Sequence, residues 1–278
     1  MAITSLANLR KAQQRPEERP LVMKTSPTVV AGRPHHTWTS AGLPAAGTAP
    51  TTAAVPTRAT TGALGQLDPT GTRRIVKMIL GWGVAGGMLT ISDRLSHQGG
   101  LSGTVTTAQT TNLPTSALTR QTSGVGVMLG LDIYTTIGAT ATTVSASYTN
   151  TDPTAGQVTP LTSFGATGFN TAPRRILLPL QVGDIGVTAV ASVTVTATTG
   201  TAGNFGVTLF YPLCSVPFDM IGRPNAMLSP QHEADFDMLF GGGTWFPIIE
   251  TGACIEFMVH STTTTVAQIQ GTLFLAED

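Results

Sequence analysis

Beyond residue 72 the chain alternates short apolar runs with polar turns, which is the pattern of a protein built from β-strands. The alternation is clearest over residues 193–196, where Val and Thr take turns, and over residues 265–275, where single apolar residues stand among small or polar neighbours. One face of each such strand would be apolar and the other covered with hydroxyl groups, as in two sheets packed face to face. We expect strands at Ile75–Leu80, Gly103–Thr107, Val125–Tyr134, Thr142–Tyr148, Arg175–Leu180, Val187–Thr198, Phe205–Tyr211, Cys254–His260 and Thr265–Leu275.

These runs predict an all-β body over residues 71–278, an antiparallel β-sandwich of the jelly-roll type. Inside this body, only Ser229–Leu239 has the pattern of a helix, with a serine cap followed by proline. The apolar run Met78–Ile91 is too short and too rich in glycine to cross a membrane, which takes roughly twenty apolar residues. We therefore expect this run to lie in the core.

Residues 1–70 have a different pattern, because a proline recurs every few positions from residue 16 onward. No helix or central strand longer than a few residues survives between these prolines. The residues between them are mostly Ala, Thr and Gly, which bury too little area to order the segment by itself. We therefore expect an extended N-terminal arm that becomes ordered by lying on a different molecule. Its expected apolar contacts are Leu21, Val22 and Trp38.

Charge is sparse and unevenly distributed. Asp, Glu, Lys and Arg make up 11% of the chain, against about 25% in an ordinary soluble domain, and 15 acidic residues balance 15 basic ones. The arm is basic around a short expected helix, Leu6–Gln14, and its contact residues would be Arg10, Lys11, Arg15 and Arg19. The C-terminal part is acidic, with Glu233, Asp235 and Asp237. The basic arm of one copy could bind the acidic end of another, although neutralisation within one chain or exposure to solvent explains the same charges.

Composition excludes several classes of protein. The 48 threonines, 31 glycines and 18 prolines exclude a helix bundle or a coiled coil, and 41% apolar residues exclude disorder of the whole chain. Cys214 and Cys254 are too few for a disulfide framework or a four-cysteine zinc site. One pairing between them stays open, and two small buried thiols are the simpler interpretation. The first thirty residues contain no apolar stretch of the kind found in secretory signals, so we expect none.

Few residue groups suggest chemistry, and none supports catalysis. Gly81–Gly86 has the spacing of a dinucleotide-binding turn, but no alternating β and α units follow, so we expect a glycine-rich loop and no cofactor. Asp93, Arg94 and His97 could form a small polar cluster, and a solvated loop is the simpler interpretation. The pair His35–His36 and the acidic end contain possible metal ligands, but an incidental pair and a solvated face explain them more simply. We expect no enzyme activity and no metal site.

The combination of a basic, proline-punctuated arm and a hydroxyl-rich β-sandwich resembles the structural proteins of tailed-bacteriophage virions, in particular capsid cement or decoration proteins. The resemblance rests on Asp93–Leu101, on Thr142–Tyr148 with the turn at 150–156, and on Ala253–Glu277. It implies a non-enzymatic virion protein, assembled in the host cytoplasm, that stabilises or joins the capsid shell through trans contacts of arm and sandwich. The implied partners are other copies of the chain, as a homo-oligomer, and a major capsid or other virion protein, with no membrane. Contact of the basic residues with packaged nucleic acid stays open.

A receptor- or glycan-binding component of a phage tail or fibre is the alternative. Exposed aromatic residues at loop tips would support it, and Trp245, beside three consecutive glycines, is the candidate. Copy number separates the two hypotheses, because a cement protein covers the shell whereas an attachment protein occupies one vertex.

Overall fold

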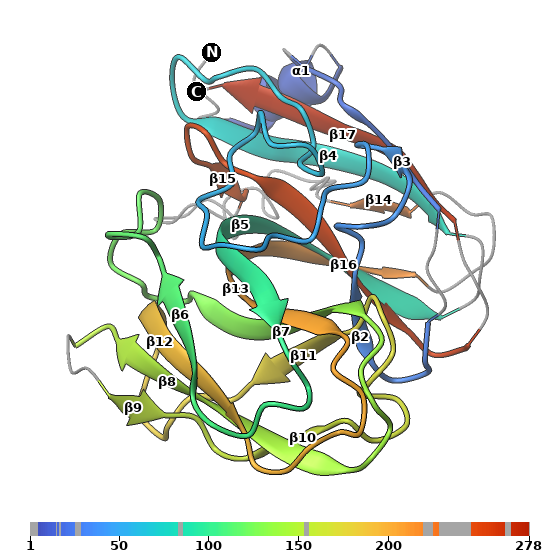
Figure 1. Cartoon of the computed structure of the whole chain (residues 1–278). Helices are drawn as coiled ribbons and strands as arrows, with labels where there is room; N and C mark the ends of the chain where they lie inside the picture. Colours follow the sequence, from blue (N-terminus) through green and yellow to red (C-terminus); the bar gives the residue numbers. More distant parts are fainter. Residues whose placement is uncertain are drawn as a thin grey trace.

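The computed structural model describes residues 5–14, 16, 18–25, 29–82, 86–152, 156–218, 225–227, 246–264 and 268–277, and Figure 1 shows curled sheets lying one above another. Strands and loops make up almost all of this part, and its α-helix lies at the N-terminus. The pairings between the named strands are antiparallel. The all-β class predicted from the sequence is therefore confirmed.

A middle sheet holds the molecule together. Its two longest strands, β5 (Gly87–Leu101) and β13 (Asn204–Phe218), have 15 residues each and pair along almost their whole length. Among the described residues the strand order is β11-β7-β13-β5-β16-β2. The remaining bounds are β11 (Arg175–Leu178), β7 (Met128–Thr135), β16 (Ile255–Ser261) and β2 (Pro34–His36).

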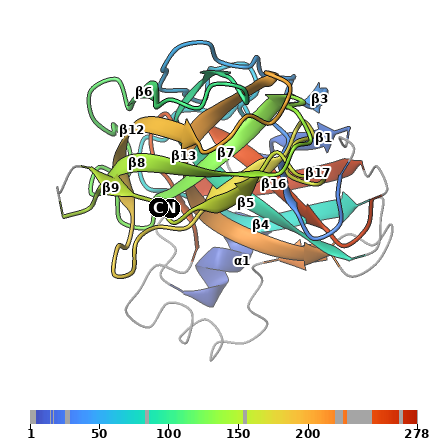
Figure 2. The ribbon, with the colours of Figure 1, turned by 60° about the horizontal axis from the view of Figure 1, so that its bottom comes forward.

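Two further sheets pack against the middle sheet. The upper sheet in Figure 1 has the order β14-β4-β17-β1-β3, with β15 beside β4, and the lower sheet has the order β10-β8-β12-β6, with β9 beside β8. The upper strands are β14 (Asn225–Met227), β4 (Arg73–Trp82), β17 (Ile269–Glu277), β1 (Leu21–Lys24), β3 (Gly42–Leu43) and β15 (Ile248–Ile249). The lower strands are β10 (Thr162–Phe164), β8 (Thr142–Asn150), β12 (Val187–Val195), β6 (Gln109–Leu113) and β9 (Gln157–Val158), and Figure 2 shows β8 and β12 side by side.

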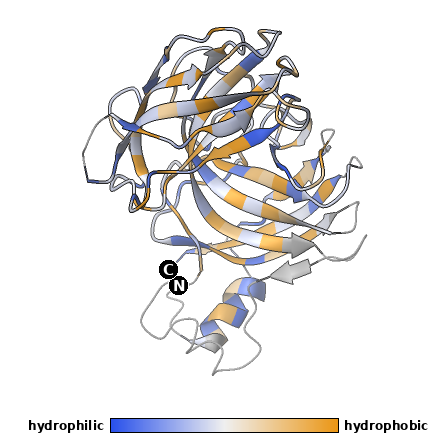
Figure 3. Ribbon diagram, turned by 90° about the horizontal axis from the view of Figure 1, so that it is seen from below, coloured by the Kyte–Doolittle hydropathy of each residue, from blue (hydrophilic) through white to orange (hydrophobic). Residues whose placement is uncertain are grey.

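The same long strands contribute to two hydrophobic cores. Leu95 of β5 packs in the core that the middle sheet shares with the lower sheet, together with Val193 of β12. Ile91, four residues earlier on β5, packs in the core shared with the upper sheet, together with Leu273 of β17. Figure 3 shows hydrophobic and hydrophilic positions following one another along the strands, as expected where one face of a strand is buried. Of the run Met78–Ile91, the residues Met78, Leu80, Leu89 and Ile91 lie in the core as predicted, whereas Met88 is exposed and residues 83–85 are outside the described residues.

The N-terminal segment packs on its own chain, which corrects the expectation of an arm that lies on a different molecule. Strand β1 pairs with β17 of the upper sheet through four consecutive residues, and β2 pairs with β16 of the middle sheet. The runs between the prolines are long enough to add short strands to two sheet edges, and edge strands tolerate proline. The segment consists of a helix, short strands and turns, and its inward-facing side chains contact this chain's own sheets.

The short N-terminal helix is confirmed with the predicted bounds, as α1 (Leu6–Gln14). The Ser5 hydroxyl accepts a hydrogen bond from the Asn8 backbone N–H at 3.2 Å, which caps the first turn. Leu9 is fully buried and packs with Val76 and Phe274 of the upper sheet. An isolated helix of nine residues is marginal in water, so this docking surface stabilises it.

Two of the glycines that made the arm look unable to pack have a packing role. A Cβ atom at Gly47 would lie 2.4 Å from the Trp38 ring, and one at Gly62 would lie 3.0 Å from the same ring. The missing side chains make room for the indole, which is 1% exposed. Small residues therefore build the pocket for Trp38.

The remaining strand predictions divide into confirmed and wrong ones. Strands are found at most of the expected runs, with bounds that differ by a few residues, but Gly103–Thr107 contains only turns and bends, and the strand there begins at Gln109. Strand β5 lies outside every expected run, because the polar residues over 92–98 conceal it. The expected helix Ser229–Leu239 and the candidate Trp245 lie outside the described residues.

Candidate functional site

Each strand of the middle sheet contributes one buried polar residue to a row that crosses the sheet. We call this set the polar row; all its members are at most 1% exposed. In strand order they are Arg175, Asp132, Thr208, Arg94, Glu256 and His36. Arg175 and Asp132 are direct register partners on neighbouring strands, so their side chains lie on one face of the sheet. The row places two arginines beside two carboxylates, so its net charge is zero.

Arg175 connects both carboxylates of the polar row. Its Nε and Nη2 atoms donate to the two oxygens of Asp132 at 2.6 and 2.8 Å, a bidentate pair. Its Nη1 and Nη2 atoms donate to the Glu256 carboxylate at 2.5 and 3.2 Å. The guanidinium also lies over the Phe210 ring, with Cζ 4.6 Å from the centroid.

Arg94 completes the network from the other side. Its Nη1 atom lies 2.8 Å from Glu256 Oε2 and 2.9 Å from Asp132 Oδ2. Its Nη2 atom donates to the Tyr134 hydroxyl at 2.6 Å and to Thr208 Oγ1 at 2.9 Å. Thr208 Oγ1 in turn donates to Asp132 Oδ2 at 2.8 Å. Every charge in the row therefore has an opposite charge and further hydrogen bonds, which is what a buried ion pair needs to persist.

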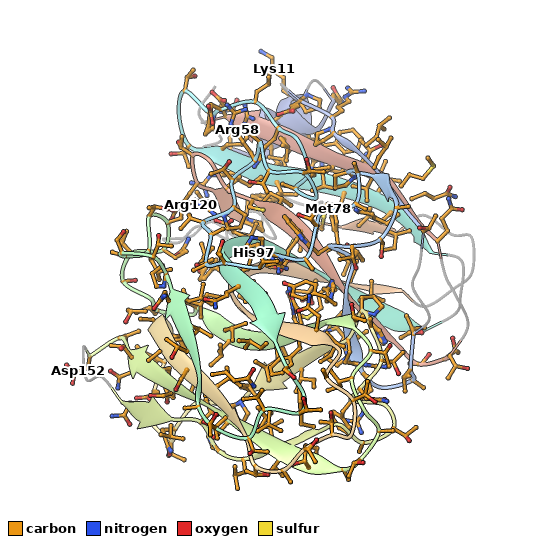
Figure 4. All side chains as sticks on the ribbon, viewed as in Figure 1. Lys11, Arg58, Met78, His97, Arg120 and Asp152 are labelled. Atoms are coloured by element: carbon orange, nitrogen blue, oxygen red, sulfur yellow. The ribbon has the colours of Figure 1, made fainter. Side chains whose placement is uncertain are left out.

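Trp38 and His97 close the row from outside. Arg94 Cζ lies 4.6 Å from the Trp38 ring centroid, and the Trp38 and His97 rings meet edge to face with centroids 5.3 Å apart. Arg94 Nε donates to His97 Nδ1 at 2.7 Å, so this nitrogen carries no proton. Figure 4 places His97 at the junction between the upper and lower parts of the molecule. Trp38, which the sequence suggested as a contact for a partner, thus covers an internal charge cluster.

A second ion pair lies next to the row. Arg120 donates from Nε and Nη2 to the two oxygens of Asp93 at 2.8 and 3.1 Å, and from Nη2 to the backbone carbonyls of Pro56 and Arg94 at 2.9 and 3.0 Å. Asp93 Oδ1 also accepts the backbone N–H of Cys254. Arg120 therefore ties the N-terminal segment, β5 and the residues before β16 together. The loop that contains Arg120 lies beside the middle sheet in Figure 4.

The electrostatics of the row favour its charged form. Burial alone would raise the pKa of Asp132, but the positive charge of Arg175 and further neighbours hold it well below its usual range. The pKa of Glu256 is lowered in the same way, since Arg175 and Arg94 outweigh the effect of burial. Burial lowers the pKa of His36 to about 4, and burial together with Arg94 lowers that of His97 to about 2. Both imidazoles are therefore neutral at physiological pH.

This arrangement is suited to holding strands together, because its members are at most 1% exposed and are paired with one another. A catalytic acid or base must come within hydrogen-bond reach of a substrate, and the carboxylates of the row are occupied by arginines. The interpretation of Asp93, Arg94 and His97 as a solvated loop is wrong, and the alternative of a polar cluster is confirmed: all three are at most 4% exposed. His35 and His36 are buried on β2, so they are not an unstructured pair.

The predicted contact residues of the arm separate into inward and outward groups. Val22 and Trp38 are each 1% exposed and contact this chain's own core, so their assignment to a partner is wrong. Leu21 is 61% exposed. The basic side chains Arg10, Lys11 and Arg19 are also exposed. Arg15 and the acidic group Glu233, Asp235 and Asp237 lie outside the described residues.

Arg73 shows that the two ends of the chain neutralise each other at one place. Its guanidinium is 2.9 Å from Glu18 Oε2, in the N-terminal segment, and 2.6 Å from Glu277 Oε1, at the end of β17. Its side chain is 2% exposed. The alternative of neutralisation within one chain therefore holds for these residues.

The outermost strands of the upper sheet carry an apolar face. On β1, exposed and buried residues alternate, so that Leu21 and Met23 point outward while Val22 and Lys24 point inward. Leu43 of β3 is the register partner of Met23, and the exposed fractions of Leu21, Met23 and Leu43 are 61%, 44% and 48%. We call these three side chains the β1–β3 edge.

Other site classes find little support in the described ranges. Within them, no group of three or more His, Cys, Asp or Glu side chains could hold a metal ion. Cys214 and Cys254 are free thiols, and burial raises the pKa of Cys214 to about 12. A search of the described helices finds none with the length and hydropathy needed to cross a membrane.

Comparisons with known proteins add no relatives. No protein-family model, no curated protein sequence and no solved structure matches this chain.

Proposed function

We propose that this chain is a non-enzymatic structural protein of a virion, which stabilises or joins the capsid shell through contacts of its surface with neighbouring subunits. The proposal keeps the function implied by the resemblance to cement and decoration proteins. In place of the expected free N-terminal arm, the proposal has an N-terminal segment that packs on its own body and presents only its outer side chains to a neighbour. A jelly-roll sandwich is the architecture that we propose for the body.

The charge distribution supports a role in assembly. Among the described residues nine charged side chains are buried, which leaves fewer charges on the surface than the composition suggests; they are Lys24, Arg73, Asp93, Arg94, Arg120, Asp132, Arg174, Arg175 and Glu256. Because surface charge keeps proteins apart in solution, a chain that hides so much of it is repelled weakly by neighbours. Such a surface suits a protein that is packed among other subunits.

The β1–β3 edge is the observation that carries the proposal. Exposed apolar side chains grouped on one surface are typical of interaction sites, and an outer strand offers backbone groups to another chain as well. Leu21 and Met23 alternate with inward residues that fix β1 to β17, so the outward pair is held in place without a partner. Arg10, Lys11 and Arg19, in or near α1, lie in the same N-terminal segment and would contact acidic groups of a neighbouring subunit.

The test is particle binding by a charged variant of the edge. The variant Leu21→Glu/Met23→Glu adds two negative charges to the β1–β3 edge without changing its buried face. Val182→Glu is the control, since Val182 is an exposed apolar residue too, in the loop between β11 and β12. Capsids assembled from the other virion proteins are mixed with each variant and sedimented. We expect the wild type and Val182→Glu to cosediment and the double variant to remain in solution.

Retention of full binding by a folded double variant, shown by an unchanged circular dichroism spectrum, would overturn the assignment of the edge. The copy number in purified virions tests the function itself, by quantitative mass spectrometry. Many copies distributed over the shell support the proposal. A few copies at one vertex contradict it and favour the attachment protein instead.

A further inference from the structure

A cavity of about 310 Å³ is lined by residues of β2, β10 and β11 and of the loops beside them. Three arginines, Arg33, Arg174 and Arg175, line it together with Thr162, Ser163 and Phe169. The volume is at the small end of the range for small-molecule sites. All the lining residues belong to the described part of the chain.

Arg174 is the unusual member of this lining. The residue is 1% exposed, yet its Nε, Nη1 and Nη2 atoms have no hydrogen-bond partner among the described residues. The next residue, Arg175, makes four hydrogen bonds to two carboxylates. A buried charge without a partner is costly, and arginine cannot escape this cost by losing its proton at neutral pH. Arg174 therefore has donors in place for an acceptor that the described chain does not supply.

Arg33 brings a second positive charge to the same cavity. Its guanidinium lies over the Phe169 ring, with Cζ 3.9 Å from the centroid, which fixes its position. Burial, and then the charge of Arg33, lower the pKa of Arg174 to about 10. No described carboxylate forms an ion pair with either arginine. His35, next to Arg174, is neutral, since burial and Arg174 lower its pKa to about 3. The charge of Arg175, which also lines the cavity, is paired with Asp132 and Glu256, so the charges of Arg174 and Arg33 are the two in this lining without a described carboxylate partner.

We propose that this cavity binds the phosphate group of a small phosphate ester or free phosphate, with Arg174 and Arg33 as its ligands. The planar guanidinium forms paired hydrogen bonds to phosphate oxygens, and a doubly charged phosphate balances two arginines. The Ser163 hydroxyl is a further donor at the rim. Space beyond the phosphate, along Phe169 and Ile176, would take a small organic group. The site is independent of the proposed role in the virion.

The experiment measures phosphate binding by the full chain with isothermal titration calorimetry, at constant ionic strength in chloride buffer. Inorganic phosphate and glycerol phosphate are titrated separately. We expect saturable binding by the wild type, and an affinity lower by about tenfold or more in Arg174→Gln, because a charge-assisted hydrogen bond is lost. Arg33→Gln should weaken binding in the same direction. Arg58→Gln is the matched control: Arg58 pairs with Asp68 and lies in the upper part of Figure 4, away from the cavity.

Each outcome decides the proposal or its source. Tighter binding of glycerol phosphate supports a phosphate ester, and equal or weaker binding supports free phosphate. Arg174→Gln removes an unpaired buried charge, so it should fold; if its circular dichroism spectrum shows otherwise, Arg33→Gln decides. The proposal is overturned if the wild type binds neither compound, if both variants bind like the wild type, or if acetate binds as tightly as phosphate.

Discussion

The substitution Asp132→Asn tests whether the polar row stabilises the fold. The amide keeps the size of the carboxylate but removes its charge, so two buried arginines would face a single acid. Asp132 accepts hydrogen bonds from Arg175 Nε and Nη2 and from Thr208 Oγ1, and it lies 2.9 Å from Arg94 Nη1. The amide nitrogen cannot accept any of these bonds. The substitution therefore removes one negative charge and replaces one acceptor oxygen by an NH2 donor that faces other donors.

The expected cost follows from this geometry. Removing one partner of a buried ion pair typically destabilises a protein by about 3–5 kcal/mol, because the other charge stays buried without compensation. Asp132 is fully buried and has no access to water that would soften the loss. For a chain of this size the corresponding fall in Tm is about 10 °C. Both values apply near neutral pH, where Asp132 is charged in the native protein.

The assay is urea unfolding at 25 °C followed by circular dichroism, with thermal unfolding as a second measurement. Asp152→Asn is the matched control, because Asp152 is exposed on the loop after β8, at the left of Figure 4. That control should change the free energy of unfolding by no more than about 0.5 kcal/mol. The double variant Asp132→Leu/Arg175→Met removes one charge of each sign. Its loss in free energy of unfolding should be smaller than the summed losses of Asp132→Leu and Arg175→Met, by about 1 kcal/mol or more.

Equal stability of Asp132→Asn and Asp152→Asn would refute this reasoning, since it would show that the buried charge does not need its partner. The reasoning would also be contradicted if the losses in free energy of unfolding of Asp132→Leu and Arg175→Met simply added in the double variant. In that case Arg175 and Asp132 would act independently, against the bidentate geometry.

Three further predictions address other parts of the structure. Trp38→Ala should lower the free energy of unfolding by about 3–5 kcal/mol in urea titrations, since it empties a closed pocket above Arg94. Gly47→Ala should cost about 1–3 kcal/mol in the same assay because its Cβ would collide with the indole, while Gly65→Ala, which meets nothing within 4 Å, should not. His36 and His97 have lowered pKa values in the fold, whereas the unfolded chain takes up their protons below pH 6.5 or so. Stability should therefore fall as pH decreases from about 6.5 to 5, by about 1.4 kcal/mol per pH unit for each histidine, and Tm in His36→Gln should depend less on pH.

Much of the strand pattern could be read from the sequence, because one-sided burial leaves an alternation. The signal fails where both faces of a strand are buried. On β5 nearly every residue from Leu89 to His97 is buried, and several are polar, so the run looks hydrophilic. Its polar residues are neutralised by neighbours from distant parts of the chain, and a single sequence does not show these pairings. That is why a central strand was interpreted as a solvated loop.

Two members of the polar row can be recognised in the sequence, because each is a single acidic residue inside an apolar run. Asp132 stands alone inside the apolar run 129–134, and Glu256 stands alone inside the run 253–259. A single acid among core residues requires a cation, and the arginine pair at 174–175 opens another apolar run. The sequence could not predict that Arg175 pairs with two carboxylates while Arg174, just before β11, pairs with none, since this depends on how each side chain is oriented in the fold. The destination of the N-terminal segment was equally hidden, because sequence patterns do not show which sheet edges are open.

The pairing of β1 with β17 and of β2 with β16 also has a consequence for synthesis on the ribosome. Strands β1 and β2 are translated more than two hundred residues before β17 and β16, so these pairings form only after β16 and β17 have been made. Until then the segment that contains β1 and β2 lacks these two partner strands. Its Thr, Ala, Gly and Pro content, with few large apolar side chains, resists aggregation during this delay. The composition of the segment thus limits aggregation before these pairings form, and the pairings with β17 and β16 hold the segment in place afterwards.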